Sequence, residues 1–167
     1  MTSKGDLVME ACIHGHLDVL KKLIKVDMPI DPDTTYWVAR EGYLEILQEL
    51  LKAGAPVNHY AVNRAAEYGH LEVLKELITY GVPISSEAAS WAARNGHLEA
   101  LKELIKAGAP IDPSAAYWAS YGGHLDVIKE LIKAKAPIER ETAQCAAVNN
   151  RVEILTHLRE KGLSHGY

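Results

Sequence analysis

The sequence predicts an all-α solenoid of six stacked helix-turn-helix repeats, on two observations. The first is a strict period. The motif Gly-His-Leu-Glu, or a close variant, recurs every 27 residues, with its glycine at Gly15, Gly42, Gly69, Gly96 and Gly123 and with Asn150 as the sixth term. The second is that each period holds two short helical patterns with their own start and stop residues. A fixed period of this length is typical of chains whose repeats contact only their neighbours.

Six copies of 27 residues account for 162 of the 167 residues, so no second domain is expected. We expect one repeat domain over residues 1–167. Its repeats one to six cover approximately residues 4–30, 31–57, 58–84, 85–111, 112–138 and 139–165.

The first helix of each repeat is predicted from its end residues. An Asp-Pro pair at 31–32, and again at 112–113, supplies an N-cap followed by proline at the first helical position. Asn58 and Ser85 stand at the equivalent place in other repeats. Gly42 follows the helix in repeat two, where a left-handed residue is expected.

This first helix has one side made of small residues, which predicts close packing between repeats. These positions hold Thr34, Thr35, Val38 and Ala39, then Ala61, Val62, Ala65 and Ala66, then Ala88, Ala89, Ala92 and Ala93, and then Ala115, Ala116, Ala119 and Ser120. The opposite side consists of positions 33, 36, 37, 40 and 41 and their equivalents, spaced as one helix face. Because these five positions differ from copy to copy, we expect packing to leave them free.

The second helix of each repeat is a plain amphipath. In repeat three its inward side is Leu71, Val73, Leu74, Leu77 and Ile78. The charged residues between them predict a solvated convex surface.

The segment from Ala92 to Ala109, Ala-Ala-Arg-Asn-Gly-His-Leu-Glu-Ala-Leu-Lys-Glu-Leu-Ile-Lys-Ala-Gly-Ala, resembles the ankyrin repeat. The family pattern A-A-x-x-G-H-L-E-V-V-x-L-L-L-x-x-G-A recurs at least five times and covers nearly the whole chain. The family unit has about 33 residues, and the six missing here fall in the linker where that family builds a β-hairpin finger. The Thr-Pro-Leu-His tetrapeptide is also absent.

The resemblance implies a scaffold that binds other proteins, through the first helices alone because the fingers are missing. The family's variable pair maps onto Arg40 and Glu41, Glu67 and Tyr68, Arg94 and Asn95, and Tyr121 and Gly122. All of these belong to the variable face.

Aromatic residues gather on the variable face. Of the 11 in the chain, eight lie there, whereas five positions in six repeats would receive about two by chance. Tyr, Trp and Arg dominate interface hot spots. The predicted partner-binding residues are Tyr36, Trp37, Arg40, Tyr60, Arg64, Tyr68, Trp91, Arg94, Tyr117, Trp118 and Tyr121. We take Trp91, Tyr117, Trp118 and Tyr121 as the centre.

The tryptophans have a second interpretation. Trp37, Trp91 and Trp118 occupy one equivalent position beside the small residues, so they can serve as packing aids between repeats. Glu10, Arg64 and Cys145 fill the same position elsewhere, which favours binding.

The sequence favours no cofactor and no metal. His16, His70, His97 and His124 form a column, but its members are expected about 10 Å apart, too far to share one ion. We interpret them as structural residues that open each second helix after a glycine turn. No catalytic motif is present, and Cys145 with His157 would face different ways. We expect no enzyme.

The charge and the composition of the chain limit the kinds of partner that we expect. The net charge is −4 with no basic stripe, which argues against nucleic acid. No signal core and no apolar run of about 20 residues occurs, and the two cysteines are too far apart to pair. We expect a cytoplasmic monomer with free thiols.

We therefore predict a protein-binding module that presents a concave aromatic and charged face of the first helices to a protein or peptide. One alternative is an aromatic cage of Trp91, Tyr117, Trp118 and Tyr121, with Glu87 as the acidic neighbour, that reads a quaternary ammonium or methyl-lysine ligand. Another is an engineered repeat binder, although drift of the framework favours a natural protein.

Overall fold

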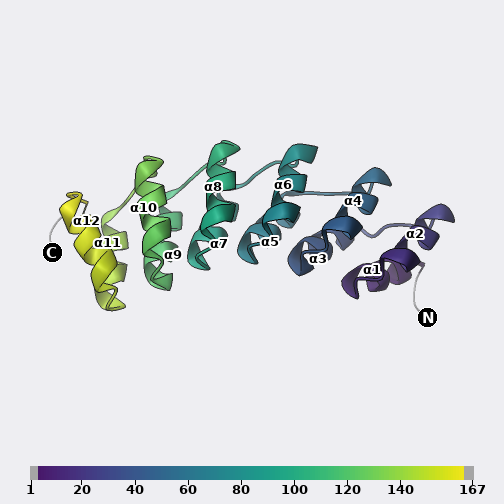
Figure 1. Cartoon of the computed structure of the whole chain (residues 1–167), viewed down its shortest axis with the longest axis horizontal. Helices are drawn as coiled ribbons and strands as arrows, with labels where there is room; N and C mark the ends of the chain where they lie inside the picture. Colours follow the sequence, from purple (N-terminus) through teal and green to yellow (C-terminus); the bar gives the residue numbers. More distant parts are fainter. Residues whose placement is uncertain (1–3, 164–167) are drawn as a thin grey trace. The chain divides into compact units, whose positions relative to one another are not determined.

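The computed structural model describes residues 4–163, which form α-helices joined by short connections and contain no strand (Figure 1). The chain divides into two compact units, Met1–Pro83 and Ile84–Tyr167. Each unit is a stack of three helix pairs. The predicted fold class, an all-α solenoid of repeats without hairpin fingers, is confirmed for the described residues.

Every helix pair falls inside one predicted repeat. The first unit contains α1 (Lys4–Ile13), α2 (Leu17–Lys25), α3 (Thr34–Glu41), α4 (Leu44–Lys52), α5 (His59–Glu67) and α6 (Leu71–Tyr80). The second contains α7 (Ser86–Arg94), α8 (Leu98–Lys106), α9 (Pro113–Gly122), α10 (Leu125–Lys133), α11 (Arg140–Val148) and α12 (Val152–Glu160). That residues 1–167 act as one domain stays a prediction, and the end of repeat six, 164–165, lies outside the described residues.

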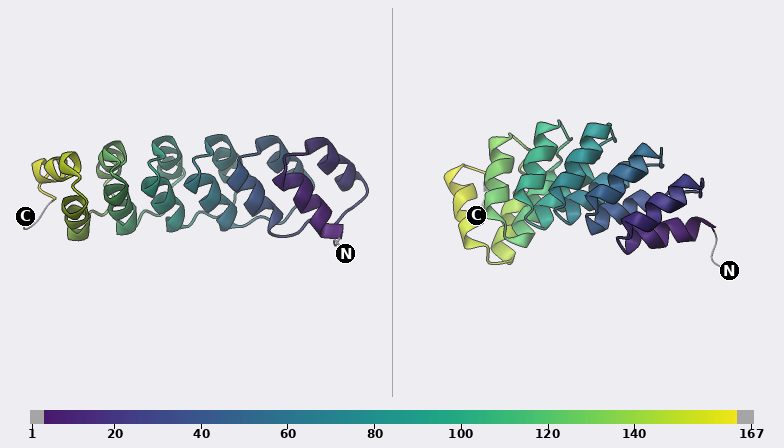
Figure 2. Two further views of the ribbon diagram at one scale, coloured as in Figure 1. Left: turned by 90° about the horizontal axis from the view of Figure 1, so that it is seen from below. Right: turned by 45° about the vertical axis from the view of Figure 1, so that its right-hand side comes forward.

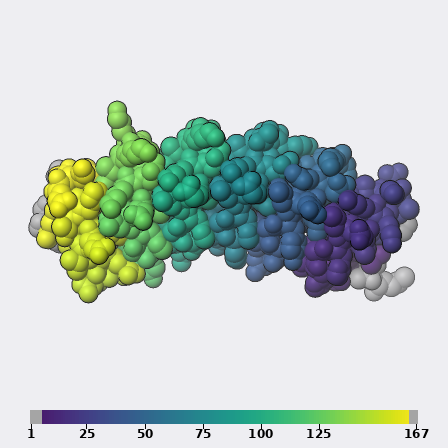
Figure 3. Space-filling view, viewed as in Figure 1, coloured from purple at the N-terminus to yellow at the C-terminus, as the bar shows by residue number. Residues whose placement is uncertain are grey.

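Within each unit the helices form two layers (Figure 2). The first helices of the repeats, here called A helices, contact one another: α1 with α3 and α3 with α5 in one unit, α7 with α9 and α9 with α11 in the other. The second, or B, helices contact one another in the same order. In the space-filling view the side chains of successive repeats within a unit meet across the visible surface (Figure 3).

The small residues of the A helices are buried, as predicted. All sixteen of the positions named above, from Thr34 to Ser120, are inaccessible or nearly so. Small side chains allow neighbouring A helices to approach closely, and the leucines of the B helices fill the space between the layers. The largest buried side chains are on B helices and include Leu47, Leu50, Leu74, Leu77, Leu101, Leu104, Ile128 and Leu131.

Of the four predicted N-caps, those at Asn58, Ser85 and Asp112 stand directly before their helices and are confirmed, and the one at Asp31 is wrong. Asn58 and Asp112 each accept a hydrogen bond from the backbone N–H two residues later, at 3.0 Å and 2.9 Å. In repeat two, however, α3 begins at Thr34, after Asp33. Asp31 instead accepts a hydrogen bond from the Asp33 N–H at 2.8 Å, and residues 32–33 form a turn before the helix.

In repeats one to five the glycine of the repeated motif follows the A helix in a left-handed conformation, and at Gly42 and Gly96 the next repeat covers it. At Gly96, with φ +74°, an added Cβ would lie 2.5 Å from the ring of His124. The equivalent contact joins Gly42 to His70, also at 2.5 Å. The glycine is therefore required both for its backbone conformation and for the space that the neighbouring side chain occupies.

The same side chains bond one repeat to the next. His70 Nε2 donates to the carbonyl oxygen of Arg40 at 2.8 Å, and His124 Nε2 donates to that of Arg94 at 3.0 Å. The interpretation of the histidine column as structural is confirmed for these two residues. In repeat six Arg151 replaces the histidine and donates from Nη2 to the carbonyl oxygen of Tyr121 at 3.1 Å.

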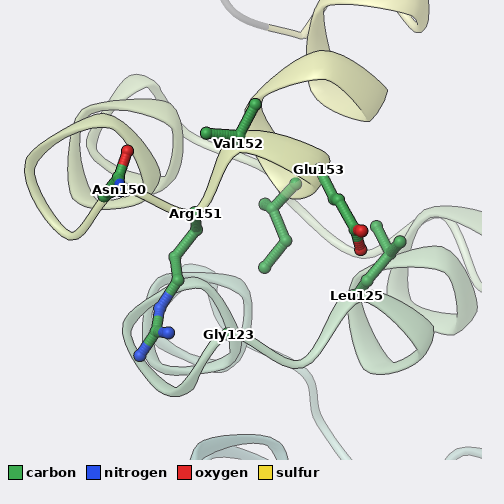
Figure 4. A pocket seen from close by; sticks show the side chains of 7 residues that line it. Gly123, Leu125, Asn150, Arg151, Val152 and Glu153 are labelled. Carbon is green, nitrogen blue, oxygen red and sulfur yellow. The ribbon is translucent and has the colours of Figure 1, made fainter.

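Figure 4 shows Arg151 reaching from the start of α12 toward Gly123. A hollow of about 280 Å³ lies beside it, between the turns of repeats five and six. Its lining is Gly123, Leu125, Asn150, Arg151, Val152, Glu153 and Ile154. Because Arg151 is already bonded to the Tyr121 carbonyl, this hollow belongs to the junction between repeats.

Substitutions at two glycines with the same backbone conformation distinguish the need for a left-handed residue from the need for space beside the next repeat. Gly96→Ala and Gly108→Ala both place alanine near φ +75°, which costs about 1–2 kcal/mol. A Cβ at Gly108 would meet nothing within 4 Å, whereas one at Gly96 would displace His124 and its hydrogen bond. We expect Gly96→Ala to be the more destabilising by at least about 1 kcal/mol in urea unfolding.

The control is the same pair of substitutions in a His124→Ala background. The excess penalty at position 96 should disappear there, because the ring that obstructs the new methyl group is gone. Equal unfolding free energies for the two single variants would show that only the backbone conformation requires glycine at position 96.

Candidate functional site

The eleven predicted binding residues lie on or directly beside the A helices, on the side opposite the buried small residues. We call the positions 33, 36, 37, 40 and 41 of repeat two and their equivalents the A-helix face. In the first unit it carries Tyr36, Trp37, Arg40, Tyr60, Arg64 and Tyr68, and in the second Trp91, Arg94, Tyr117, Trp118 and Tyr121.

In the first unit Arg40 lies between two aromatic rings from neighbouring repeats. Its guanidinium carbon is 5.2 Å from the centre of the Trp37 ring and 5.7 Å from that of Tyr68. Arg40 Nε also donates a hydrogen bond to the Tyr68 hydroxyl oxygen at 3.3 Å. A cation over an aromatic face contributes about 0.5–2 kcal/mol, so this contact helps to hold repeats two and three together.

A second cation in this unit points the other way along the stack. The Arg64 guanidinium lies 5.1 Å from the centre of the Tyr36 ring and forms an ion pair with Glu67. Tyr36 in turn meets Trp37 edge to face, with ring centres 5.1 Å apart. Tyr60 and Tyr68 remain exposed, with 52% and 44% of their surfaces accessible.

The second unit repeats the arrangement with two tryptophans. Arg94 lies 5.4 Å from the Trp91 ring centre and 4.7 Å from that of Trp118. Tyr117 and Tyr121 meet Trp118 edge to face, at 5.2 Å and 5.7 Å. The structure therefore brings together the four residues expected at the centre of the site, and adds Arg94 to them.

The tryptophans are half-buried, which bears on their two interpretations. Trp91 and Trp118 face the same guanidinium from successive repeats, so they do take part in packing between repeats. The tyrosines differ: Tyr117 and Tyr121 are 37% and 46% exposed. On this face the tyrosines are the aromatic residues most open to a partner.

The expectation that packing leaves all five positions of the A-helix face free is wrong at three residues. Asn63, Ser90 and Cys145 are buried, with 3%, 9% and 6% of their surfaces accessible. The side chains at these positions pack between neighbouring A helices. Ser90 Oγ, for example, lies 2.6 Å from Ser114 Oγ on the next A helix.

Sequence reasoning missed one part of the face, a groove of about 420 Å³ between α9 and α11. It is lined by Tyr117, Tyr121, Glu141, Gln144, Cys145, Val148 and Asn149. The last five occupy A-helix-face positions of repeat six. The sequence prediction selected tyrosine, tryptophan and arginine residues, so it did not include these five. Their positional equivalence to residues 33, 36, 37, 40 and 41 was the available signal.

The cysteines are buried free thiols. Burial raises the pKa of Cys12 from an ordinary value of 9.0 to about 12. Burial also raises the pKa of Cys145, although hydrogen bonds with Tyr117 and Asn149 oppose this shift. His157, the residue considered with Cys145 in the sequence, lies 3.9 Å from the carboxylate of Glu160. A raised pKa disfavours the thiolate that a nucleophile needs.

Residues 4–163 hold neither a metal-binding cluster nor a membrane-spanning helix. No three His, Cys, Asp or Glu side chains gather there in a way that would hold a metal ion. None of the helices in that range has the length and apolar character needed to span a bilayer.

Comparisons with known proteins identify the repeat. Residues 35–112 and 89–166 match a family model described as ankyrin repeats, three copies. No curated protein matches the chain. Among solved structures, the fold is similar to the crystal structure of the human ASB11 ankyrin repeat domain, with 20% sequence identity and a TM-score of 0.81. That match covers 93% of this chain and 83% of the other.

The buried thiols give a prediction with a defined pH dependence. Because the folded state holds Cys12 as the neutral thiol, its contribution to stability should be complete below pH 9 and decline as the pH rises toward 12. At pH 8 we expect Cys12 to react with a disulfide reagent such as DTNB at least about a hundredfold more slowly in the folded than in the unfolded chain.

The Cys145→Ser variant isolates Cys12 in this measurement, and the same variant in denaturant supplies the reference rate. Reaction of folded Cys12 at the rate of the unfolded thiol would contradict its burial.

Proposed function

Since the chain belongs to the ankyrin-repeat family, we propose that it is a non-catalytic scaffold that binds another protein or a peptide through the A-helix face. Ankyrin repeats are generally protein–protein interaction modules. The family thus supports the class of function, and the choice of face rests on the residues of this chain.

One observation carries the proposal: four tyrosines stand exposed on the A-helix face beside arginine and tryptophan. Tyr60, Tyr68, Tyr117 and Tyr121 are between 37% and 52% exposed. A tyrosine offers a large contact area and a hydroxyl group at the expense of only two side-chain torsions. Exposed tyrosines next to arginines are the composition expected of an interface hot spot.

The arginines of this face are already ordered before a partner arrives. Arg40 and Arg94 each lie against two rings, so their side chains have less conformational freedom to lose on binding. Immobilising a free arginine costs about 0.5–1.5 kcal/mol. Arg40, Arg64 and Arg94, with the acidic residues Asp33, Glu67 and Glu87, would orient the partner.

The B helices offer a less suitable surface. Their exposed sides carry Lys–Glu or Lys–Asp pairs three residues apart, at 49–52, 72–75, 99–102, 103–106, 126–129 and 130–133. Exposed pairs of this kind contribute little to stability and favour hydration. Charged residues of this type are depleted at the centres of interfaces.

The alternative function, recognition of a quaternary ammonium or methyl-lysine ligand, meets an obstacle. The faces of Trp91 and Trp118 that such a cage would use lie against the guanidinium of Arg94. An external cation would have to displace this arginine and would meet its charge. We therefore rank this function second. The possibility of an engineered origin stays open. That the protein acts in the cytoplasm as a monomer and does not bind nucleic acid also stays a prediction.

The proposal is tested by removing exposed tyrosines rather than tryptophans, because Trp118→Ala would also release Arg94. We expect the Tyr117→Ala, Tyr121→Ala double variant to lose a partner captured from lysate, with affinity weakened by about 2 kcal/mol or more once that partner is purified. Calorimetric titration measures the difference.

Tyr80→Ala is the matched control, because Tyr80 is 51% exposed on the B helix α6 and lies off the A-helix face. Circular dichroism should show the native helix content for all variants. Equal capture by the double variant and the native chain, or greater loss with Tyr80→Ala, would remove the A-helix face of this unit as the binding surface.

A further inference from the structure

The groove between α9 and α11 interrupts a regular pattern of the A-helix face. In repeats four and five a guanidinium is enclosed by two rings, in the order Trp91, Arg94, Trp118. One repeat later, 27 residues along the chain, Tyr121 stands for Arg94 and Cys145 stands for Trp118. The thiol is far smaller than an indole, and no cation takes the place of the guanidinium, so a hollow of about 420 Å³ remains.

The lining of this groove fits a cation. Tyr117 and Tyr121 supply two exposed aromatic rings, and Glu141 supplies an exposed carboxylate. Glu141 forms no ion pair with any residue between 4 and 163. The seven lining residues include no lysine or arginine. Aromatic faces and a carboxylate together attract a positive charge.

Hydrogen-bond acceptors add to this character. Asn149 Nδ2 donates to the Cys145 carbonyl oxygen at 2.9 Å, which leaves its side-chain oxygen as an acceptor. Gln144, beside it, is half-buried. The positive charge that influences Cys145 is Arg151, whose guanidinium donates to the Tyr121 carbonyl oxygen at 3.1 Å. That bond holds Arg151 at the junction between repeats.

We propose that this groove receives an arginine side chain of the protein partner, which completes between repeats five and six the cation-on-aromatic packing that Arg94 makes one repeat earlier. The proposal rests on the proposed function of the A-helix face and names the chemistry that it recognises there. A planar guanidinium can stack on the tyrosine rings while it donates two parallel hydrogen bonds to the Glu141 carboxylate.

Other side chains fit less well. An acidic side chain would meet the charge of Glu141. An apolar side chain would remove water from Glu141, Gln144 and Asn149 without replacing their hydrogen bonds. A lysine would gain the charge interaction but not the planar stacking.

The probe is N-acetyl-arginine amide, compared with N-acetyl-citrulline amide, which has nearly the same shape and no charge. Backbone amide shifts of the isotope-labelled full chain are followed by NMR during titration with each compound. We expect saturable shifts at Gln144, Cys145 and Asn149 with the arginine compound, and at least about tenfold weaker binding of the citrulline compound. Equal binding of the two, or shifts confined to other helices, would overturn the proposal.

Two variants make the assignment specific. Cys145→Trp places in repeat six the residue that Trp37, Trp91 and Trp118 have at the equivalent position, so it should fold while it fills the groove and abolishes binding of the probe. Glu141→Gln should weaken binding severalfold, whereas Glu153→Gln, an exposed carboxylate on α12, should leave it unchanged. Undiminished binding by Cys145→Trp overturns the assignment.

The same variants separate this inference from the proposed function. If the partner is lost with Tyr117→Ala, Tyr121→Ala but is held fully by Cys145→Trp and Glu141→Gln, the arginine site is wrong and the binding face stands. If the probe binds the groove as expected but the tyrosine variants still capture every partner, the groove binds a guanidinium group, but the A-helix face is not the partner-binding surface and the assignment to a partner's arginine fails with it.

Discussion

The contact between a left-handed glycine and the side chain that opens the next B helix is the constraint on which the rest of each unit depends. His70 and His124 occupy the space that a Cβ on Gly42 or Gly96 would need, and each donates to the carbonyl oxygen two residues before that glycine. Arg151 makes the equivalent bond to the Tyr121 carbonyl oxygen beside Gly123, so the donor, the acceptor and the open space are found at three junctions. Successive repeats are therefore placed by the turn, while the small residues of the A helices let them close.

Because cohesion depends on these positions, the opposite side of the A helices can vary. The variation is limited, however. Arg40 and Arg94 link rings of successive repeats, so part of the face stabilises the stack, and the tyrosines around it are its most exposed aromatic residues. Within each unit the A-helix face thus combines a layer of packed tryptophan and arginine with accessible tyrosines.

The sequence predicted most of the framework because the framework is periodic. The helix pairs, the buried small residues, the left-handed glycines and the role of His70 and His124 all follow from comparing equivalent positions. The start of α3 was missed by two residues because an Asp-Pro pair can form a turn as readily as a cap. The burial of Ser90 and the Arg94 contacts were missed because they depend on pairs 24 residues apart, such as Ser90 with Ser114 and Arg94 with Trp118, which no pattern within one repeat reveals.

His70 and His124 each bond to a carbonyl 30 residues earlier, so the donor comes from one repeat and the backbone acceptor from the repeat before it. Arg151 shows that the donor can change its chemistry while the acceptor, a backbone group, stays the same. An acceptor that belongs to the backbone does not depend on which side chain stands there. Duplication or loss of one whole 27-residue period would therefore recreate the junction without any compensating substitution, and copy number can change in evolution more easily than repeat length.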